Sequence, residues 1–413
     1  MPAATATATT APTVTPTPPV PVRHREPHRE PPWELARTLA HAAPRPSPSR
    51  TVPLAAAVGL TLAETLRTPQ PLPSFDTAAM DGYAVAGTGP WRIRGTVRAG
   101  TVWEGALGAG ECAEISTGAQ VPAGAHAVLP VESALSGADG LVAGPVPPPG
   151  RHIRRAGEDA PAGSGLVPAG TRIGPALLGL AASCGHDTLP VRPAPRVRVL
   201  VTGDELDHAG PPGPGRVRDA LGPALPALVA ALGGESRGVR HVGDRPGALD
   251  AAVHGARDTE VVAVTGSTSA GATDRLRRLL AGAGARMVVD TVACRPGHPM
   301  LLAELRSGRW VVGLPGNPYA ALVAAHTLLG PLLAGLCGRA LDPLPRVPVT
   351  GPVRPAPGLT RLVPVTWDGT GTCARVTAGH GAAFLRGAAV GDALAALPPD
   401  WTEGGPAPLL SAG

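Results

Sequence analysis

The hydrophobic pattern is clearest between residues 194 and 338, where apolar runs of strand length alternate with runs of helical periodicity. The strand-like runs RVRVLV, SRGVRHV, EVVAVT and VVGL are followed in turn by the helix-like runs LPALVAALG, PGALDAAVH, DRLRRLLAG and NPYAALVAAHTLLGPLLAGLC. Strands that alternate with helices predict a parallel, doubly wound sheet. Ligands of such sheets bind at the carboxyl ends of the strands. We therefore expect functional residues in the loops that follow these strands.

A small β domain is predicted over residues 91–146, where short apolar strands such as WRIRGTV and HAVLPVE are separated by Gly turns. The flanking segments, residues 33–90 and 147–193, contain helical runs and many prolines. They predict one discontinuous helical and irregular linker domain into which the β domain is inserted.

The last part of the chain returns to short strands between Pro and Gly turns, which predicts a C-terminal β barrel over residues 339–402. Residues 1–32 are rich in Ala, Thr and Pro and lack the pattern of a secretory signal, so we expect a disordered tail. Residues 403–413 are expected to be a frayed tail. The predicted fold class is therefore α/β and multidomain.

Composition agrees with this division and limits the possible surroundings of the protein. A chain of 413 residues corresponds to about two to four domains. Hydrophobic residues make up 43% of the chain and aromatic residues only 2%, so the cores must consist of Leu, Val and Ala. Apolar runs stay short of the ~20 residues that span a bilayer, which predicts no membrane partner.

The charge and the cysteines favour a cytoplasmic protein with small anionic ligands. The net charge is +5 and all 36 basic positions are arginine, yet the arginines are scattered without aromatic residues between them. This pattern predicts no nucleic-acid partner. The five cysteines contain no CxxC pair, which indicates neither a zinc cluster nor a disulfide framework and fits a reducing compartment.

The segment VVGLPGNP contains Asn317, the only asparagine of the chain. Gly316 and Asn317 both tolerate positive φ, so the chain could turn sharply here after a strand. Pro318 can open the next helix, and the N-terminus of a helix favours anions. An ordinary strand-to-helix turn with nothing bound explains the segment equally well.

Carboxylates and anion donors follow several of these runs. Asp81, Glu205, Asp244 and Asp274 could hold Mg²⁺, which prefers oxygen ligands. The loop GSTSAG at residues 266–271, together with Arg295 and His298, could bind an anion. Such groups suit a substrate whose phosphoanhydride is cleaved. Each one taken singly also fits an ordinary turn, a solvated carboxylate or a surface histidine.

Two alternative chemistries fail on spacing. A nucleophilic serine hydrolase needs Gly two residues before and after the serine, and Ser269 has Ser267 in the first of these positions. Dinucleotide binding of the Gly-rich type needs GxGxxG after the first strand, which is not present.

Seven motifs in order carry a family resemblance. They are PSFDTAAMDGYAV, ISTGAQVPAGAHAVLPVE, RRAGEDAPAGSGLVPAGT, VLVTGDEL, TGSTSAGATD, CRPGHP and GLPGNP. With them, the chain resembles the molybdopterin molybdenumtransferases, the MoeA family, which includes the C-terminal domain of gephyrin. The resemblance extends from about Trp33 to Pro399.

The resemblance implies a homodimer of four-domain subunits that inserts molybdate into adenylylated molybdopterin, with Mg²⁺-assisted release of AMP. It implies that Asp81 and Thr117 of one subunit meet the doubly wound domain of the other. The functional polar positions that it implies are Asp81, Thr117, Glu205, Asp244 and Asp274, of which Glu205, Asp244 and Asp274 would bind the metal. Arg295, His298 and Pro299 fall where the family binds the oxyanion. The pterin and nucleotide would contact Gly203, Asp204, Gly266, Ser267, Ser269, Gly271, Pro315, Gly316 and Asn317. Other proteins of molybdenum cofactor biosynthesis are also expected as partners.

The chain departs from the family at several site positions. Ser267 replaces a glycine, His298 a lysine, and Ala320 a serine. Leu221 replaces an asparagine, and Ala382 or Ala383 a further serine. The family's C-terminal arginine aligns with Pro364, with Arg361 nearby. Two alternatives therefore accompany the transferase hypothesis: a diverged paralogue that binds molybdopterin without catalysis, and a Mg²⁺-dependent nucleotide hydrolase.

Overall fold

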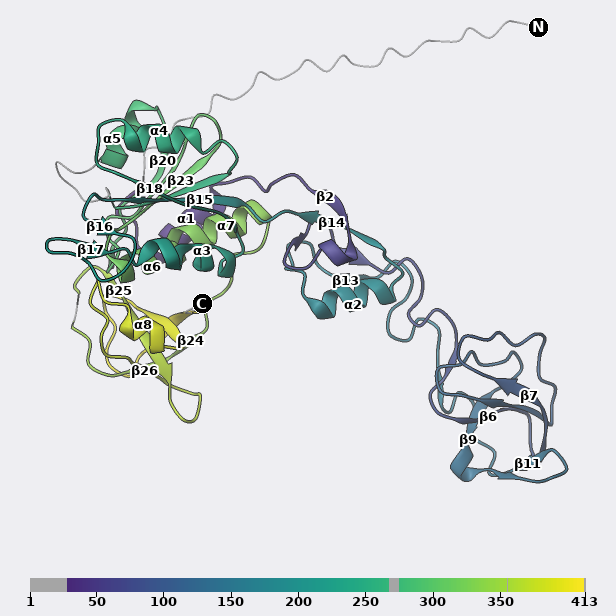
Figure 1. Cartoon of the computed structure of the whole chain (residues 1–413). Helices are drawn as coiled ribbons and strands as arrows, with labels where there is room; N and C mark the ends of the chain where they lie inside the picture. The colour runs from purple at the N-terminus through teal and green to yellow at the C-terminus, as the bar shows by residue number, and fades with distance from the viewer. Residues whose placement is uncertain (1–27, 267–274, 355, 412–413) are drawn as a thin grey trace, which may run out of the picture.

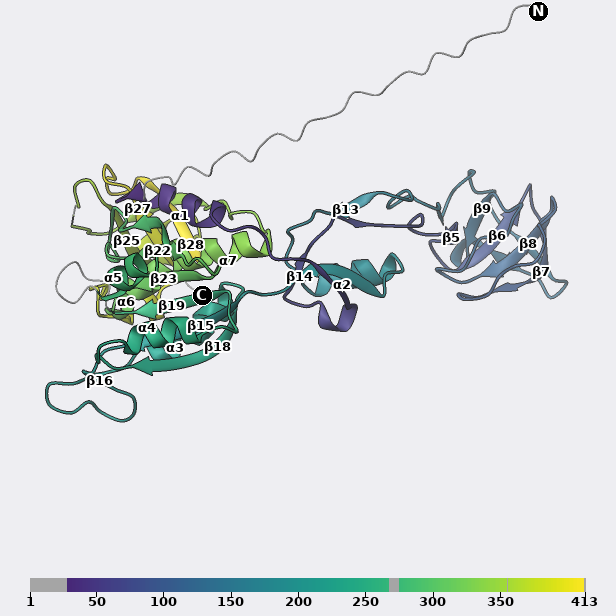
Figure 2. The same cartoon turned by 90° about the horizontal axis from the view of Figure 1, so that it is seen from above.

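The protein is elongated, with two bodies joined by a narrow linker domain. The computed structural model describes residues 28–266, 275–354 and 356–411. The doubly wound domain and the C-terminal barrel form one body, and the β domain lies at the opposite end (Figures 1 and 2). The α/β multidomain fold predicted from the pattern is confirmed.

A seven-stranded sheet forms the centre of the doubly wound domain. Its strands, in spatial order, are β1 (His28–Arg29), β20 (Arg286–Asp290), β22 (Leu301–Glu304), β23 (Trp310–Leu314), β19 (Val261–Thr265), β15 (Arg196–Thr202) and β18 (Glu235–Val242). The four strands β23, β19, β15 and β18 are parallel, as predicted. Strand β22 is antiparallel to both of its neighbours, because a short turn joins it directly to β23.

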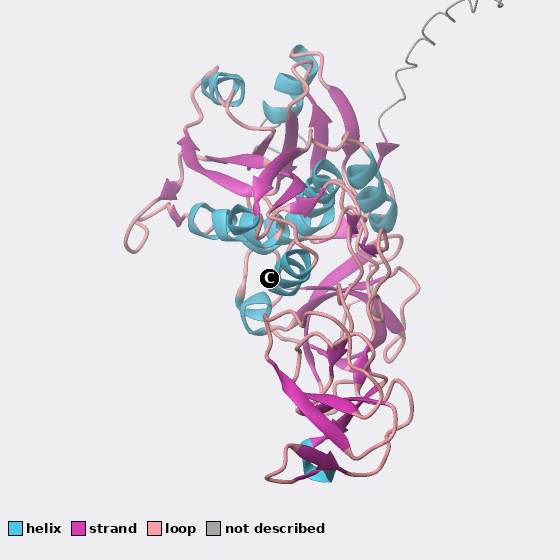
Figure 3. Cartoon of the chain, turned by 90° about the vertical axis from the view of Figure 1, so that its right-hand side faces the viewer, coloured by secondary structure: helices cyan, strands magenta, loops and turns pink. Residues whose placement is uncertain are grey.

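Helices cover both faces of this sheet (Figure 3). One face packs against α1 (Trp33–Ala42), α3 (Leu221–Ala231) and the helical run α6 (Pro318–Ala324), η3 (Ala325–Leu329) and α7 (Gly330–Cys337). The other packs against α4 (Ala248–Gly255) and α5 (Arg275–Gly282). Alternate residues of β15 serve the two cores: Val199 and Val201 face the first, and Leu200 the second.

The run from α6 to α7 corrects one expectation about apolar segments. Residues Pro318–Cys337 form a 20-residue helix with a mean hydropathy of 1.8, long and apolar enough to cross a membrane by these criteria alone. In the structure, 83% of the segment that meets these two criteria is buried. The surrounding sheet, helices and barrel therefore account for its apolar surface.

Helix α1 and strand β1 belong to the doubly wound domain, which corrects the predicted start of that domain. Trp33 is 1% exposed within the core on the α1 side of the sheet, and its Nε1 donates to Thr327 Oγ1 at 2.9 Å. His28 and Arg29 extend the sheet beyond β20, although both lie within the predicted tail. The apolar face of α1 finds its partner almost 300 residues away in sequence, which local periodicity cannot indicate.

The linker domain contains a three-stranded sheet with α2 (Pro175–Ser183) packed beside it. The strands of this sheet, in spatial order, are β2 (Arg50–Pro53), β14 (Thr188–Arg192) and β3 (Thr61–Leu62). Two strand pairs continue toward the β domain: β4 (Leu66–Arg67) with β13 (Gly165–Val167), and β5 (Thr77–Ala78) with β12 (Ile153–Arg154). Segments from before and after the β domain pair throughout, as the discontinuous domain requires.

The β domain contains a six-stranded sheet that starts earlier than predicted. Its strands, in spatial order, are β10 (Leu135–Ser136), β11 (Leu141–Ala143), β7 (Trp91–Val97), β8 (Glu111–Ile115), β6 (Gly82–Ala86) and β9 (Ala127–Pro130). Strand β6 precedes the predicted boundary at Trp91 and lies inside the sheet, between β8 and β9. The boundary therefore moves toward the N-terminus.

Five strands close the predicted C-terminal barrel. They are β25 (Thr360–Trp367), β26 (Ala374–Val376), β24 (Arg346–Thr350), β28 (Pro406–Ser411) and β27 (Ala393–Leu397), which pairs again with β25. A short helix, α8 (Arg386–Val390), packs against β25. Strand β28 corrects the expected frayed tail, because Leu409 and Leu410 are buried in the barrel. Strand β21 (Cys294–Arg295) joins β25 from the doubly wound domain.

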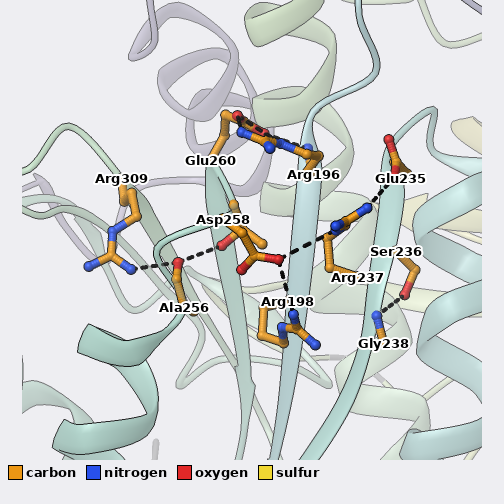
Figure 4. A network of polar contacts seen from close by, with 11 residues as sticks. Arg196, Arg198, Glu235, Ser236, Arg237, Gly238, Ala256, Asp258, Glu260 and Arg309 are labelled. Atoms are coloured by element: carbon orange, nitrogen blue, oxygen red, sulfur yellow. Dashed lines mark hydrogen bonds and ion pairs between the residues drawn. The ribbon is translucent and has the colours of Figure 1, made fainter.

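Ion pairs hold together the amino ends of the parallel strands (Figure 4). Arg196, at the start of β15, binds Glu260, just before β19, through contacts of 2.6 to 3.2 Å. Arg198 and Arg237 both approach Asp258, at 3.3 and 3.5 Å. Polar groups at this edge are thus satisfied within the protein.

Replacing Glu260 with Gln should destabilise this domain at neutral pH by about 1 kcal/mol, because a bidentate, partly buried ion pair is lost. Burial raises the pKa of Glu260, but hydrogen bonds from Arg196 and its charge outweigh burial and hold the pKa below 4.5. The stabilisation is therefore complete above pH 4.5 and is lost as the pH falls through the lowered pKa.

Hydrogen exchange of the β15 and β19 amides measures this change. The matched control is Glu235→Gln, because the ion pair of Glu235 with Arg237 lies on the exposed surface. This change should alter the free energy of unfolding by less than about 0.5 kcal/mol. Equal losses in the two variants would contradict the assignment.

Candidate functional site

The polar loops gather at the opposite, carboxyl edge of the sheet. The chain runs from β15 outward to β18 and then returns to β19 on the other side, so the strand order reverses between β15 and β19. The register aligns the ends of these strands: Val201 pairs with Thr265, and Thr265 with Leu314. Such a reversal is where open α/β sheets bind ligands. We call the loops after β15, β18, β19 and β23 the strand-end loops.

Asp204 and Asp244 join two of these loops. The Asp244 N–H donates to Asp204 Oδ1 at 3.0 Å, and the Asp204 N–H approaches Asp244 Oδ2 at 3.4 Å. Arg275 binds both the Asp244 carbonyl and Asp244 Oδ1, each at 2.7 Å. The predicted ligand Asp204 thus also braces the loops, and Asp244 has one oxygen committed to a guanidinium.

Glu205 presents an exposed carboxylate over the end of β15. Gly203 has φ +136°, and a Cβ added there would lie 2.7 Å from Glu205 Oε1. The predicted metal ligands Glu205 and Asp244 therefore stand on neighbouring strand-end loops. Mg²⁺ commonly takes only one or two carboxylates and completes its shell with water and phosphate oxygens, so two carboxylates on neighbouring loops could hold such an ion. The third predicted ligand, Asp274, lies outside the described residues.

The loop after β19 begins with a turn that only glycine can make. Gly266 has φ +72°, its N–H donates to Leu314 O at 3.1 Å, and a Cβ there would lie 2.6 Å from Thr202 Oγ1. Thr202 Oγ1 in turn donates to Thr265 O at 2.7 Å. The predicted ligands Ser267, Ser269 and Gly271 lie outside the described residues.

The LPGNP turn does not use positive φ, and that expectation is wrong. Asn317 has φ −68° and ψ 125°, and Gly316 is absent from the described residues with positive φ. The reason is Pro318, which forces the preceding residue into an extended conformation. Asn317 O accepts the N–H of Ala321 at 2.9 Å and starts α6. Pro315, Gly316 and Asn317 thus lie at the strand end, as predicted.

The first turn of α6 binds the doubly wound domain to the barrel. The fully buried Tyr319 donates its hydroxyl to Leu362 O of β25 at 3.0 Å, and burial raises its pKa. Ala320, which stands where the resemblance expects a serine, donates its backbone N–H to Ala382 O at 3.1 Å. The loop that contains His380 and Ala382 is thereby fixed against α6.

A pocket of about 380 Å³ opens beside this contact. Its lining residues are Arg295, Pro296, Arg354, Arg361, Leu362, His380, Gly381 and Ala382. Arg295 and Arg361 are direct partners on the paired strands β21 and β25. Burial lowers the pKa of Arg361, and the charges of Arg295 and Arg354 lower it further. We call this site the arginine pocket.

The charge of the arginine pocket is not balanced within the described part of the chain. None of the described carboxylates forms a salt bridge with Arg295, Arg354 or Arg361. Paired like charges on adjacent strands are destabilising unless an anion lies between them. The pocket therefore has the charge to hold an oxyanion.

The predicted oxyanion-binding residues do not all lie at one place in the structure. Arg295 lines the arginine pocket, whereas His298 and Pro299 are not among its lining residues. His298 Nδ1 lies 2.9 Å from Val292 O and 3.8 Å from Glu30 Oε1. Pro299 O accepts a bond from Arg277 at 3.3 Å.

Arg354 and His380 were missed by sequence reasoning, and Arg361 was placed only near a functional position. The pairing of β21 with β25, which brings Arg295 beside Arg361, has no local signature. The bias of the chain toward arginine also hides functional arginines among many others. The Gly-His pair in AGHG was the one available sign of His380.

Asp81 and Thr117 form a compact pair in the β domain. The Thr117 N–H and Oγ1 both donate to Asp81 Oδ1, at 2.6 and 3.0 Å, and these bonds lower the pKa of Asp81. The pair lies beside β6 and β8, at the opposite end of the molecule from the strand-end loops (Figure 1). A single chain therefore brings these two residues together but not to the rest of the predicted site.

Comparisons with known proteins agree with this architecture. One protein-family model, described as the MoeA N-terminal region (domain I and II), matches residues 32–185. A second, described as a probable molybdopterin binding domain, matches residues 198–335.

Relatives resemble most of the chain. Molybdopterin molybdenumtransferase 2 of Mycobacterium tuberculosis is 36% identical over 300 residues, covering 68% of this chain and 74% of the relative. The molybdopterin molybdenumtransferase of Synechococcus elongatus is 32% identical over 347 residues, covering 79% and 86%. The crystal structure of a molybdopterin biosynthesis MoeA protein from Pyrococcus horikoshii has a TM-score of 0.75 at 27% identity, covering 93% of this chain and 99% of that chain.

Replacing Thr117 with Val should raise the pKa of Asp81, because one of the two Thr117 donors that stabilise the carboxylate is removed. Titration of the carboxyl resonance by nuclear magnetic resonance measures this pKa. Thr96, another exposed threonine of the β domain, provides the control variant Thr96→Val, which should leave the pKa of Asp81 unchanged. An unchanged pKa in Thr117→Val would refute the role of the hydroxyl.

Proposed function

Because the chain belongs to the MoeA family of molybdopterin molybdenumtransferases, we propose that it inserts molybdate into adenylylated molybdopterin and releases AMP. This reaction is a step of molybdenum cofactor biosynthesis. The observation that supports it most directly is the arginine pocket beside the strand-end loops.

Molybdate is a tetrahedral dianion, and the arginine pocket has the chemistry to bind it. Arg295 and Arg361 supply permanent positive charges from paired strands, and guanidinium groups donate several hydrogen bonds in a fixed plane. Arg354 adds a third charge. By the family resemblance Arg295 stands where a lysine is expected, so the positive charge is kept at that position.

His380 can complete the binding of the anion. Its Nδ1 lies 2.8 Å from Thr377 O, and since a carbonyl only accepts, Nδ1 holds the proton of the neutral ring. Nε2 is then the ring nitrogen that remains available to a ligand of the pocket. His380 would supply a polar contact near positions where the family has serine hydroxyls and this chain has Ala320 and Ala382 or Ala383.

The strand-end loops would hold the pterin and nucleotide phosphates. Gly203 and Gly266 lie at the topological switch point, where the ligands of such sheets bind, and neither has room for a side chain. The neighbouring loops containing residues 267–271 and 315–317 are the remaining expected contacts.

The acidic residues of this edge suit a bound magnesium ion. Glu205, Asp244 and Asp274 would hold Mg²⁺, which when bound neutralises charge on the phosphoanhydride. Arg275 keeps the Asp244 carboxylate in place and balances part of its charge. The hydrogen bond from the Asp244 N–H to Asp204 Oδ1 holds the two loops together for this role.

We also propose that the active species is a homodimer. Asp81 and Thr117 lie far from the strand-end loops of their own chain (Figure 2), so they can reach such a site only in a second subunit. Mixing an Asp81→Asn chain with a Glu205→Gln chain should restore activity that neither has alone. Cytoplasmic location, other cofactor-biosynthesis proteins as partners, and the lack of nucleic-acid or membrane partners remain predictions.

Replacing Arg361 or Arg295 with Gln should weaken molybdate binding about 10-fold to 100-fold, the usual contribution of a charge-assisted hydrogen bond. Isothermal titration calorimetry with molybdate measures this. The control is Arg375→Gln, which removes an exposed barrel arginine that does not line the pocket. Wild-type affinity in Arg361→Gln and Arg295→Gln would contradict the assignment of the pocket.

The proposed reaction is tested with adenylylated molybdopterin, molybdate and Mg²⁺, by measuring AMP and the molybdenum cofactor. Formation of both products supports the proposal. Binding of molybdopterin without AMP release would favour the non-catalytic paralogue instead. Cleavage of simple nucleotides without pterin would favour the hydrolase.

A further inference from the structure

Three metal-ligating side chains converge outside the proposed active site. His208 follows β16 (Leu206–Asp207) in the connection to β17 (Val217–Arg218), Asp219 precedes α3, and His241 is the penultimate residue of β18. One ligand atom from each lies within 4.8 Å of the others. Among the described residues, this is the one group of three or more such side chains that gathers in this way.

The distances suit a transition metal. Asp219 Oδ2 lies 2.8 Å from His241 Nε2 and 3.8 Å from His208 Nδ1. Ligand atoms at about 2.0–2.2 Å from a tetrahedral zinc ion are about 3.3 Å apart, between these two values. The imidazole rings are already close, with centroids 3.6 Å apart. Small side-chain movements would complete the geometry.

Asp219 is held in the orientation that a metal ligand needs. Its Oδ1 accepts the N–H groups of Leu221 and Gly222, both at 2.9 Å, which fixes the carboxylate at the start of α3. Its Oδ2 is left to the two histidines. Hydrogen bonds that orient a ligating carboxylate in this way are a regular feature of metal sites.

Asp219 is buried with no described arginine beside it. Its side chain is only 4% exposed, and its two salt-bridge partners in the described part of the chain are His208 and His241. A buried carboxylate has to be hydrogen-bonded or paired, and Asp219 has two backbone N–H donors and these two imidazoles around it. A divalent ion bound by all three side chains would add a full positive charge to these contacts.

We propose that His208, Asp219 and His241 bind Zn²⁺ or a similar divalent transition metal, with water in the fourth position. Two imidazoles and one carboxylate are typical ligands of such ions, and Mg²⁺ prefers an all-oxygen shell. The metal would connect two parts of the domain. One is the loop of residues 203–220, which contains Glu205 and ends at α3, and the other is the edge strand β18. The site is independent of the proposed reaction.

Calorimetry of the full chain with Zn²⁺ tests the site. Wild type should bind one equivalent, and His208→Ala and His241→Ala should each lose at least about 10-fold in affinity, since even outer-shell losses cost this much. Asp219→Asn keeps an acceptor for the helix amides but removes the anionic oxygen, so it separates metal binding from helix capping. It should fold and lose Zn²⁺.

Matched controls distinguish this site from adventitious binding and from the magnesium site. His254→Ala removes another histidine that pairs with an aspartate, Asp250, and should leave Zn²⁺ binding unchanged. Glu205→Gln should also leave it unchanged. Equal affinity of wild type, His208→Ala and His241→Ala for Zn²⁺, or no binding by wild type, would overturn the proposal.

Proteolysis gives a second readout. The chain has no lysine, so trypsin cuts only after arginine, and Arg216 lies in the loop between His208 and Asp219. Zn²⁺ should slow cleavage after Arg216 in wild type and in His254→Ala, but not in His241→Ala. Cleavage that is insensitive to Zn²⁺ in wild type would contradict the role of the metal in holding the loop.

Discussion

The body of the protein depends on the burial of one apolar helix, residues 318–337. A helix that is hydrophobic on all sides has to be covered on all sides. The sheet, α1 and the barrel provide this cover, and Tyr319 adds a buried hydrogen bond to β25. Because its first turn starts at Asn317, the packing of this helix also sets the position of the LPGNP turn and of the loop containing His380. The packing of this helix in the core therefore also fixes the arrangement of the site.

The sequence predicted those parts of the fold whose signal is local. Apolar runs and the turns after them located the parallel strands and placed Glu205, Asp244, Gly266 and Asn317 at the carboxyl edge of the sheet. Elements whose partners are remote were misassigned: α1 packs on Thr327, and β28 closes a barrel that was expected to end before it. Periodicity shows which face of an element is apolar but not which surface covers it.

The candidate site follows the same division. Motif resemblance found Arg295, Asp81 and Thr117, and the hydrogen bonds of the last two agree with their pairing. It did not find Arg354 or His380, since these reach the pocket through the closure of the barrel and the pairing of β21 with β25. The positive φ expected for Gly316 and Asn317 came from their residue types alone, whereas Pro318 already favours an extended conformation at Asn317.

The unbalanced guanidinium groups of the arginine pocket link the stability of the protein to its surroundings. An arginine cannot relieve repulsion by losing its proton at any pH that the folded chain tolerates. A tetrahedral oxyanion that binds in this pocket of the folded chain would stabilise the fold by mass action, and sulfate, like molybdate, is a tetrahedral dianion. Occupancy would then be a competition whose outcome depends on the relative concentrations and affinities of such anions. If molybdate is the ligand, as proposed, charge alone would not separate it from sulfate, so selection would depend on the size of the anion or on the steps after binding.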